Sequence, residues 1–225
     1  MTNKNIFVAC DVSSQKEIID LLELIHNDVS GIKIGLQYIT QRSPEEIREL
    51  SKFKKPIFYD GKFFDIKNTL VESIKSLKNL NVSYATIHLL NGLDALKAAN
   101  QTAQEINLKL LGVSILTSFI DKDLKSLGFN NNVKDQVKRL IEIAMEADLH
   151  GVICSPLEIK MIKEIAPKLK CFTPGIRMGN AKDDQKRTMT ANEAVKEGSD
   201  CLIIGRPITK GNPKENIKNI LLSID

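Results

Sequence analysis

The chain has 225 residues, of which 42% are hydrophobic, so it is long enough and apolar enough to bury a substantial core. It carries 32 basic and 28 acidic side chains, a net charge of +4, with both signs mixed along its whole length. This small and scattered excess argues against nucleic acid as a partner. The sequence shows neither a run of about 18 apolar residues that could span a bilayer nor a secretory signal at its start. We therefore expect a cytoplasmic globular protein without a membrane partner.

The sequence contains four cysteines, and none has the Cys-x-x-Cys or Cys/His spacing of a metal site. Each lies inside or at the end of a short apolar run, a setting typical of buried thiols. We expect reduced core residues and no bound metal. The four residues are Cys10, Cys154, Cys171 and Cys201.

The apolar runs repeat as strand followed by helix, without a low-complexity linker to divide the chain. Short runs rich in branched residues predict eight strands. They lie at residues 6–12, 31–35, 56–60, 84–89, 110–116, 151–154, 171–173 and 201–204. Because these runs are continuously apolar rather than strictly alternating, they favour a parallel sheet covered by helices.

Segments with helical spacing lie between these strands, and five of them begin with a capping signature. In each, a Ser, Thr or Asn side chain can cap a backbone N–H while a Glu three residues later reaches back. The pairs are Ser14 with Glu17, Ser43 with Glu46, Ser155 with Glu158, Thr190 with Glu193, and Asn212 with Glu215. Pro44, Pro156 and Pro213 take the first helical position, where a missing N–H costs nothing.

Eight strands that alternate with helices predict an α/β fold, a (β/α)₈ TIM barrel that forms a single domain over residues 1–225. The alternative is an open doubly wound sheet. The Gly-x-Gly-x-x-Gly turn that would support dinucleotide binding in such a sheet is missing from the sequence. In a barrel, residues at the carboxyl ends of the strands face the active site, so charged residues there are candidates for function.

Charged residues stand at four of the predicted strands. Asp11 ends the first run, Lys33 interrupts the second, and Asp60 ends the third, while Arg206 follows the eighth. Alternate residues of a strand point to the same side, so Asp60 and Lys62 can enter one cavity that Lys33 reaches from the neighbouring strand. Alternating signs are expected where charges are buried. A structural network of salt bridges at the barrel mouth is the alternative interpretation.

The third run continues into the pattern Asp-x-Lys-x-x-Asp-Ile at residues 60–66, which resembles the orotidine 5′-monophosphate decarboxylase family. The resemblance covers nearly the whole chain. It includes Gly-x-Lys-x-Gly at 31–35, Leu-Thr-Ser at 116–118, Thr-Pro-Gly-Ile-Arg at 173–177, Asp-Gln-Lys-Arg at 184–187 and Ile-Gly-Arg-Pro-Ile-Thr at 204–209. The sequence departs from many members at Gly61, Phe64 and Lys67, where they carry Leu, His and Pro. Gly61 is expected to loosen the strand end locally.

The resemblance implies that the protein removes CO₂ from C6 of orotidine 5′-monophosphate and forms uridine 5′-monophosphate in pyrimidine biosynthesis, without a cofactor. It implies that Lys62 protonates C6, with Lys33, Asp60 and Asp65 as the other catalytic residues. The flanking carboxylates would favour the ammonium form of Lys62. Asp65 is expected to reach the site from the partner subunit of a homodimer.

The resemblance also implies a set of substrate-binding residues. Gly205 would allow close backbone approach to the phosphate, and Arg206 would offer it a fork of charged donors. Residues 175–187 are expected to form a lid that closes over the substrate. The other predicted contacts are Asp11 and Thr69 at the ribose, Ser118 at the pyrimidine amide edge, Gln185 between the pyrimidine and the phosphate, and the neighbouring Thr117 and Pro174.

Two alternatives to this function remain at the sequence level. The Asp-x-Lys-x-x-Asp element also resembles magnesium-dependent barrels that decarboxylate or condense sugar phosphates, where the acidic residues would bind the metal. A noncatalytic phosphate-ligand sensor or a weak nucleic-acid binder is less favoured, because the lysines are spread over many helices without an aromatic stacking platform. His88 ends the fourth run, and a structural role is favoured over a catalytic one.

Overall fold

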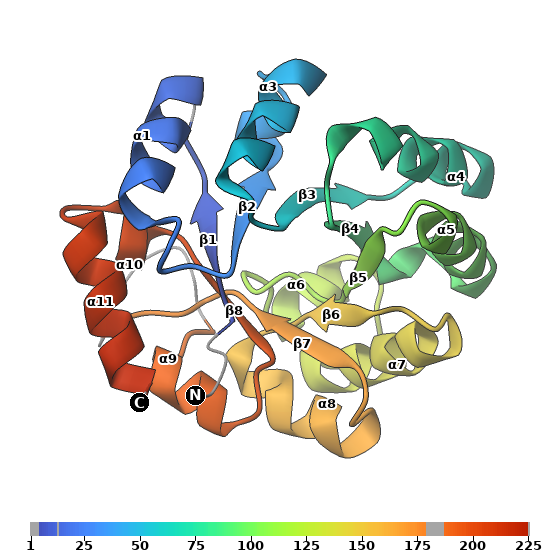
Figure 1. Cartoon of the computed structure of the whole chain (residues 1–225). Helices are drawn as coiled ribbons and strands as arrows, with labels where there is room; N and C mark the ends of the chain where they lie inside the picture. The colour runs from blue at the N-terminus through green and yellow to red at the C-terminus, as the bar shows by residue number, and fades with distance from the viewer. Residues whose placement is uncertain (1–4, 13, 179–186, 225) are drawn as a thin grey trace.

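The computed structural model describes residues 5–12, 14–178 and 187–224. Eight parallel strands pair in chain order and close into a barrel, because β1 pairs with both β2 and β8 (Figure 1). The strands are β1 (Ile6–Cys10), β2 (Gly31–Gly35), β3 (Ile57–Phe63), β4 (Tyr84–His88), β5 (Lys109–Val113), β6 (Gly151–Ile153), β7 (Lys170–Thr173) and β8 (Cys201–Ile204). The predicted (β/α)₈ TIM barrel is confirmed.

Helices surround the ring of strands on its outer side (Figure 1). They are α1 (Gln15–Ile25), α2 (Leu36–Ile39), α3 (Pro44–Glu49), α4 (Lys67–Ser76), α5 (Leu93–Glu105), α6 (Asp121–Ser126), α7 (Val133–Glu146), α8 (Ile159–Ile165), α9 (Ala191–Lys196), α10 (Arg206–Thr209) and α11 (Pro213–Ile224). Short 3₁₀ helices are η1 (Leu50–Phe53), η2 (Leu77–Leu80), η3 (Leu89–Asn91) and η4 (Pro156–Glu158). Along the described stretches of chain, no helix is both long enough and apolar enough to cross a lipid bilayer.

The capping residues predicted from the sequence make their hydrogen bonds. Ser14 accepts from the backbone N–H of Glu17 at 3.1 Å, and Asn212 accepts from that of Glu215 at 3.3 Å. The other three pairs form reciprocal capping boxes, and the one that begins at Ser155 opens η4 rather than an α-helix. Since a cap of this kind contributes about 1 kcal/mol, these local signals fix where the helices begin.

Five strands, β1, β3, β4, β5 and β6, end at other residues than the sequence indicates, and the differences at β3 and β5 bear on the site. β3 continues past residue 60 to Phe63, and its pairing with β4 shifts between Tyr59 and Phe63. Lys62 takes a φ of 48° in this irregular stretch. β5 ends at Val113, so residues 116–118 lie in the loop that follows it.

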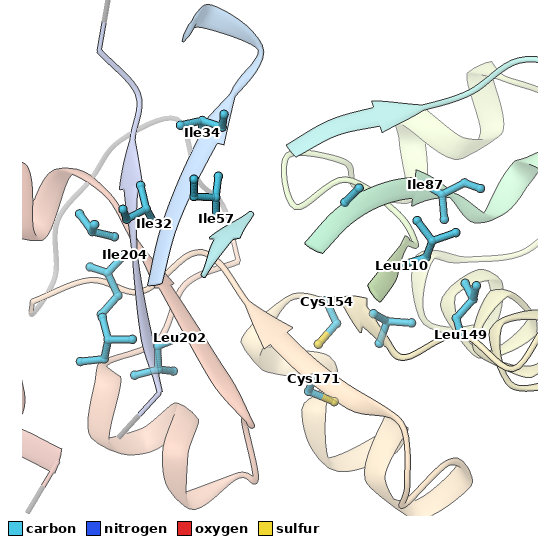
Figure 2. Close-up of a cluster of buried hydrophobic side chains, with 14 of the residues drawn as sticks. Ile32, Ile34, Ile57, Ile87, Leu110, Leu149, Cys154, Cys171, Leu202 and Ile204 are labelled. Carbon is cyan, nitrogen blue, oxygen red and sulfur yellow. The ribbon is translucent and has the colours of Figure 1, made fainter. Parts of the chain in front are cut away.

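The larger hydrophobic cluster lies between the barrel and its helices. Figure 2 shows part of it, including Ile32 and Ile34 of β2. Cys154, just after β6, and Cys171 of β7 belong to the same cluster. All four cysteines are buried and free, as the sequence predicts.

Aromatic side chains fill the barrel interior toward the amino ends of the strands. Phe7, Phe58 and Phe172 are at most 4% exposed and meet edge to face, with ring centroids 6.2–6.4 Å apart. Tyr84 adds a fourth ring, 5.6 Å from that of Phe7. Such packing closes this end of the barrel, and the inward residues nearer the carboxyl ends are left to line a site.

Candidate active site

A cavity of about 360 Å³ opens at the carboxyl ends of the strands. Its lining comes from seven of the strands or the loops that follow them, which is where a barrel of this type carries its active site. Nine of the predicted site residues line it. They are Asp11, Lys33, Asp60, Lys62, Thr117, Ser118, Pro174, Gly205 and Arg206.

A row of alternating charges crosses this cavity. Lys33 Nζ lies 2.9 Å from Asp11 Oδ1 and 3.5 Å from Asp60 Oδ2. Lys62 Nζ donates to Asp60 Oδ1 at 2.9 Å. The Asp60 carboxylate therefore stands between two ammonium groups. The side chain of Lys62 is 34% exposed, against 9% for Lys33 and 13% for Asp60, so Lys62 is the member of this inner group most open to a ligand.

Neighbouring charges keep the buried groups of this row ionised. Burial alone would raise the pKa of Asp60, but the charges of Lys33 and Lys62, with hydrogen bonds from Lys62 and Thr86, hold it below its usual value. Burial would lower the pKa of Lys33, and the carboxylates of Asp60 and Asp11 raise it instead. Asp60 and Lys33 therefore keep their opposite charges on both sides of neutral pH.

Two glycines leave room for this arrangement. A Cβ at Gly35 would lie 2.9 Å from Asp11 Oδ1 and 3.1 Å from Lys33 Nζ, so a side chain there would displace that ion pair. A Cβ at Gly61 would lie 2.8 Å from Cε1 of the Tyr59 ring. Because Tyr59 stacks on Phe63 at 5.8 Å, the ring pair packs over Gly61, and the strand continues where the sequence suggested a loosened end.

Two arginines from the segments after β7 and β8 also line the cavity. Arg206 begins α10 directly after β8 and Gly205, as expected for a phosphate site. Arg177 also lines the cavity and is 8% exposed, although sequence reasoning gave it no role. The available signal in the sequence was its place in the Thr-Pro-Gly-Ile-Arg motif. A guanidinium that is buried needs an anionic or carbonyl partner. Here it donates to the Ile176 carbonyl at 2.8 Å.

A further arginine holds the loop after β5. Arg187 donates to the backbone carbonyls of Ile115, Leu116 and Thr117 at 3.0–3.4 Å. Its guanidinium also pairs with the buried carboxylate of Glu158. Burial raises the pKa of Glu158, and Arg187 opposes that effect. These contacts place Thr117 and Ser118 beside the cavity, a role that the sequence did not indicate.

Two of the described predicted site residues do not line this cavity. Asp65 and Thr69 are exposed and lie outside its lining, Asp65 before α4 and Thr69 on it. The Asp65 backbone N–H donates to Asn91 Oδ1 at 3.0 Å, which fixes the segment that carries it. Gln185 lies outside the described residues, as does most of the predicted lid.

His88 ends β4, as predicted, and has a local structural partner. Its Nδ1 accepts from the backbone N–H of Leu90 at 3.3 Å, and its ring lies 5.5 Å from that of Phe64. Burial, with a smaller contribution from the Lys62 charge, lowers its pKa. His88 does not line the cavity. These contacts support the structural interpretation favoured from the sequence.

The barrel and this cavity together define a class of protein. Lysines and carboxylates at the carboxyl ends of the strands, with guanidinium groups in the same cavity, are typical of a (β/α)₈-barrel enzyme that acts on an anionic ligand. Within the residues that the structure describes, no group of three or more His, Cys, Asp or Glu side chains is placed to hold a metal ion.

Comparisons with known proteins specify the family. The model of the orotidine 5′-phosphate decarboxylase / HUMPS family matches residues 4–220, and the chain belongs to this family. Orotidine 5′-phosphate decarboxylase of Wolbachia sp. subsp. Brugia malayi is 38% identical over 218 residues, which cover 96% of this chain and 97% of that protein. The one of Wolbachia pipientis subsp. Culex pipiens is 39% identical over 221 residues, covering 97% and 98%.

A solved structure agrees with these relatives. The crystal structure of orotidine 5′-phosphate decarboxylase from Lactobacillus acidophilus has a TM-score of 0.87 to this chain at 28% identity, and it covers 99% of this chain and 100% of that one. Proteins of that name are carboxy-lyases, so the chain is an enzyme of the carboxy-lyase class.

Proposed function

We propose that the protein converts orotidine 5′-monophosphate to uridine 5′-monophosphate and CO₂, a step in the synthesis of this pyrimidine nucleotide, without a cofactor. The observation that carries the proposal is the row Lys33–Asp60–Lys62 inside a cavity that Arg177 and Arg206 also line. A nucleotide of this kind presents a phosphate at one end and a ring carboxylate at the other. The cavity offers cationic groups to both.

Lys62 supplies the proton in this proposal. The bond between C6 and the carboxylate breaks, its electron pair stays on C6, and CO₂ leaves. The pyrimidine offers no adjacent carbonyl to delocalise the pair, so stabilisation must come from a preorganised charge. The Lys62 ammonium stabilises the growing charge, transfers a proton to C6 and regains one from water. Its hydrogen bond to Asp60 holds it in place before the reaction.

Asp60 and Lys33 play supporting roles. Asp60 would lie close to the departing carboxylate, and the repulsion between them relaxes as CO₂ leaves. We assign this effect a smaller share than the preorganised Lys62. Lys33 neutralises the buried Asp60 carboxylate and links it to Asp11. The charge of each member of the row therefore stabilises the charge of its neighbour.

The remaining cavity residues would bind the substrate. Gly205 and Arg206 take the phosphate, and Asp11 takes the ribose hydroxyls. Binding energy from these remote groups helps to orient C6 at Lys62. The pyrimidine would contact Thr117, Ser118, Pro174 and, in the closed enzyme, Gln185.

We further propose that the working unit is a homodimer in which Asp65 and Thr69 reach the site of the partner subunit. Both are exposed and lie outside the cavity of their own chain. The same segment exposes Phe64 at 63% and Ile66 at 74%, and Leu90 beside it is 39% exposed. Large apolar side chains grouped on a surface are typical of a protein interface.

Residues 1–225 act as one barrel domain in this proposal, and we place the enzyme in the cytoplasm. Four buried free thiols suit a reducing compartment.

The test is a spectroscopic assay of the purified protein. Added to orotidine 5′-monophosphate, it should abolish the ultraviolet absorbance of the orotate chromophore, and the rate should survive EDTA. Activity that EDTA abolishes and Mg²⁺ restores would favour a magnesium-dependent barrel enzyme. An unchanged spectrum would contradict the proposal.

A further inference from the structure

A buried threonine on β4 stands opposite the irregular part of β3. Tyr59 pairs with Ala85 and Phe63 pairs with Ile87, so residues 60–62 of β3 stand against the single residue Thr86. This stretch cannot pair with β4 through a regular ladder of backbone hydrogen bonds. Thr86 is 0% exposed and does not line the cavity.

The Thr86 hydroxyl makes two hydrogen bonds at this place. It accepts from the backbone N–H of Lys62 at 2.8 Å and donates to Asp60 Oδ1 at 3.0 Å. The hydroxyl thereby replaces the missing ladder partner of Lys62. It also uses both of its roles, donor and acceptor, on the two residues proposed to act on the substrate.

The donation to Asp60 fixes the carboxylate rotation. Oδ1 accepts from Thr86 and from Lys62 Nζ, at 3.0 and 2.9 Å, while Oδ2 faces Lys33 Nζ at 3.5 Å. Each oxygen therefore has its own partners, and rotation of the carboxylate would break at least one contact. The Thr86 hydrogen bond also helps to hold the pKa of Asp60 below its usual value, against burial, which would raise it.

The acceptance from Lys62 supports an unfavourable backbone conformation. With a φ of 48°, Lys62 lies in the left-handed region, which costs a non-glycine residue about 1 kcal/mol or more. In this conformation the Lys62 ammonium donates to Asp60, two residues earlier, at 2.9 Å. On the other side of the strand, the stacked rings of Tyr59 and Phe63 pack over Gly61.

We propose that Thr86 is a positioning residue for the decarboxylation, because its hydroxyl fixes both the backbone of Lys62 and the carboxylate that holds the Lys62 ammonium. This inference rests on the proposed function. It assigns Thr86 no contact with the substrate, so its loss should affect the chemical step rather than binding.

Two substitutions of opposite character test the proposal. Thr86→Val keeps the shape and removes the hydroxyl, whereas Thr86→Ser keeps the hydroxyl and removes a methyl group. We expect Thr86→Val to lower kcat about 10-fold or more, the loss typical of a hydrogen bond to a charged group. KM for orotidine 5′-monophosphate should stay within about threefold, and Thr86→Ser should keep most of kcat.

A role in packing alone predicts the reverse order, because Val fills the site and Ser leaves a gap. The proposal is overturned if Thr86→Val keeps wild-type kcat, or if both variants lose kcat equally. Should Thr86→Val fail to fold, Thr86→Ser and Thr86→Ala give the same contrast, since both lack the methyl group and only Ser keeps the hydroxyl. A wild-type enzyme that leaves the substrate unchanged would instead refute the proposed function itself.

Discussion

Lys62 owes its place to contacts at both ends of the residue. Its backbone is held in a left-handed conformation by Thr86, and its ammonium is held by Asp60. A lysine on an exposed helix face is free to rotate, and it loses side-chain entropy whenever it forms such a contact. Lys62 is already ordered before a substrate arrives, and preorganisation of this kind is what an electrostatic mechanism requires.

Substitution of Lys62 separates chemistry from binding. We expect Lys62→Ala to lower kcat by roughly 10²–10⁴-fold, the usual contribution of a positioned proton donor, or by more if its charge also stabilises the carbanion. Binding of uridine 5′-monophosphate, measured by calorimetry, should change only a few-fold. Lys97→Ala is the matched control, because Lys97 pairs with Glu146 on the exposed surface. Equal effects of the two substitutions would contradict the assigned role.

The charges around Asp60 predict how stability depends on pH. Because the folded-state pKa of Asp60 is lowered, its ionised form stabilises the fold above its unfolded pKa, and this contribution is lost as the pH falls through the folded value. Lys33 has a raised pKa, so its contribution is lost only at alkaline pH. The difference in unfolding free energy between the wild type and Asp60→Asn, measured with urea, should be flat near neutrality and shrink on acidification. A difference that grows toward low pH would contradict this account.

At the scale of elements, the periodicity of the sequence predicts the strands, the helix starts and the order of the barrel. Continuous apolar runs and capping pairs are local signals. The capping pairs are predictable because their hydrogen bonds join residues that are close in the sequence. The bulge of β3 is different, because it depends on the pairing with Thr86 of β4 and on the ring pair over Gly61. A reading of one strand at a time cannot show such a contact.

The part of the site that the sequence predicts is the part whose residues lie close together in one motif or on neighbouring strands. Asp60 and Lys62 follow from strand alternation, and Lys33 follows from the neighbouring strand. Arg177 and Arg187 stand in the motifs that carry the resemblance, but their individual roles were not predicted, because a charge in a polar loop carries no periodic signal. Their roles depend on a cavity and on carbonyls that lie far away in the sequence.

The proposed phosphate contact of Arg206, in the segment after β8, can be tested with two substrates. If Arg206 binds the phosphate, Arg206→Ala should lower kcat/KM for orotidine 5′-monophosphate about 100-fold, as expected for loss of a charged bidentate contact. With orotidine, which lacks the phosphate, wild type and variant should react equally slowly. An equal loss on both substrates would show that Arg206 acts elsewhere.

At the scale of the whole molecule, the barrel holds only part of the predicted machinery. The cavity of one chain contains the lysines and the arginines, while Asp65 and Thr69 face outward among exposed apolar side chains. A twofold assembly would supply two composite sites and cover those side chains at once.

Mixing of two inactive variants tests this sharing. Lys62→Ala and Asp65→Ala subunits, unfolded together and refolded as a mixture, should regain about a quarter of wild-type activity. Half of random dimers are mixed, and each of these has one intact site of two. Each variant refolded alone is the control. No recovery, despite mixed dimers shown by mass spectrometry, would place Asp65 outside the partner's site.

The most direct test of the mechanism is a crystal structure of the enzyme with a nucleotide analogue bound. The account predicts the phosphate at Gly205 and Arg206 and the Lys62 ammonium within about 3.5 Å of C6 of the pyrimidine, the distance of reacting atoms. A Lys62 side chain that points away from C6, with the analogue fully bound, would contradict it.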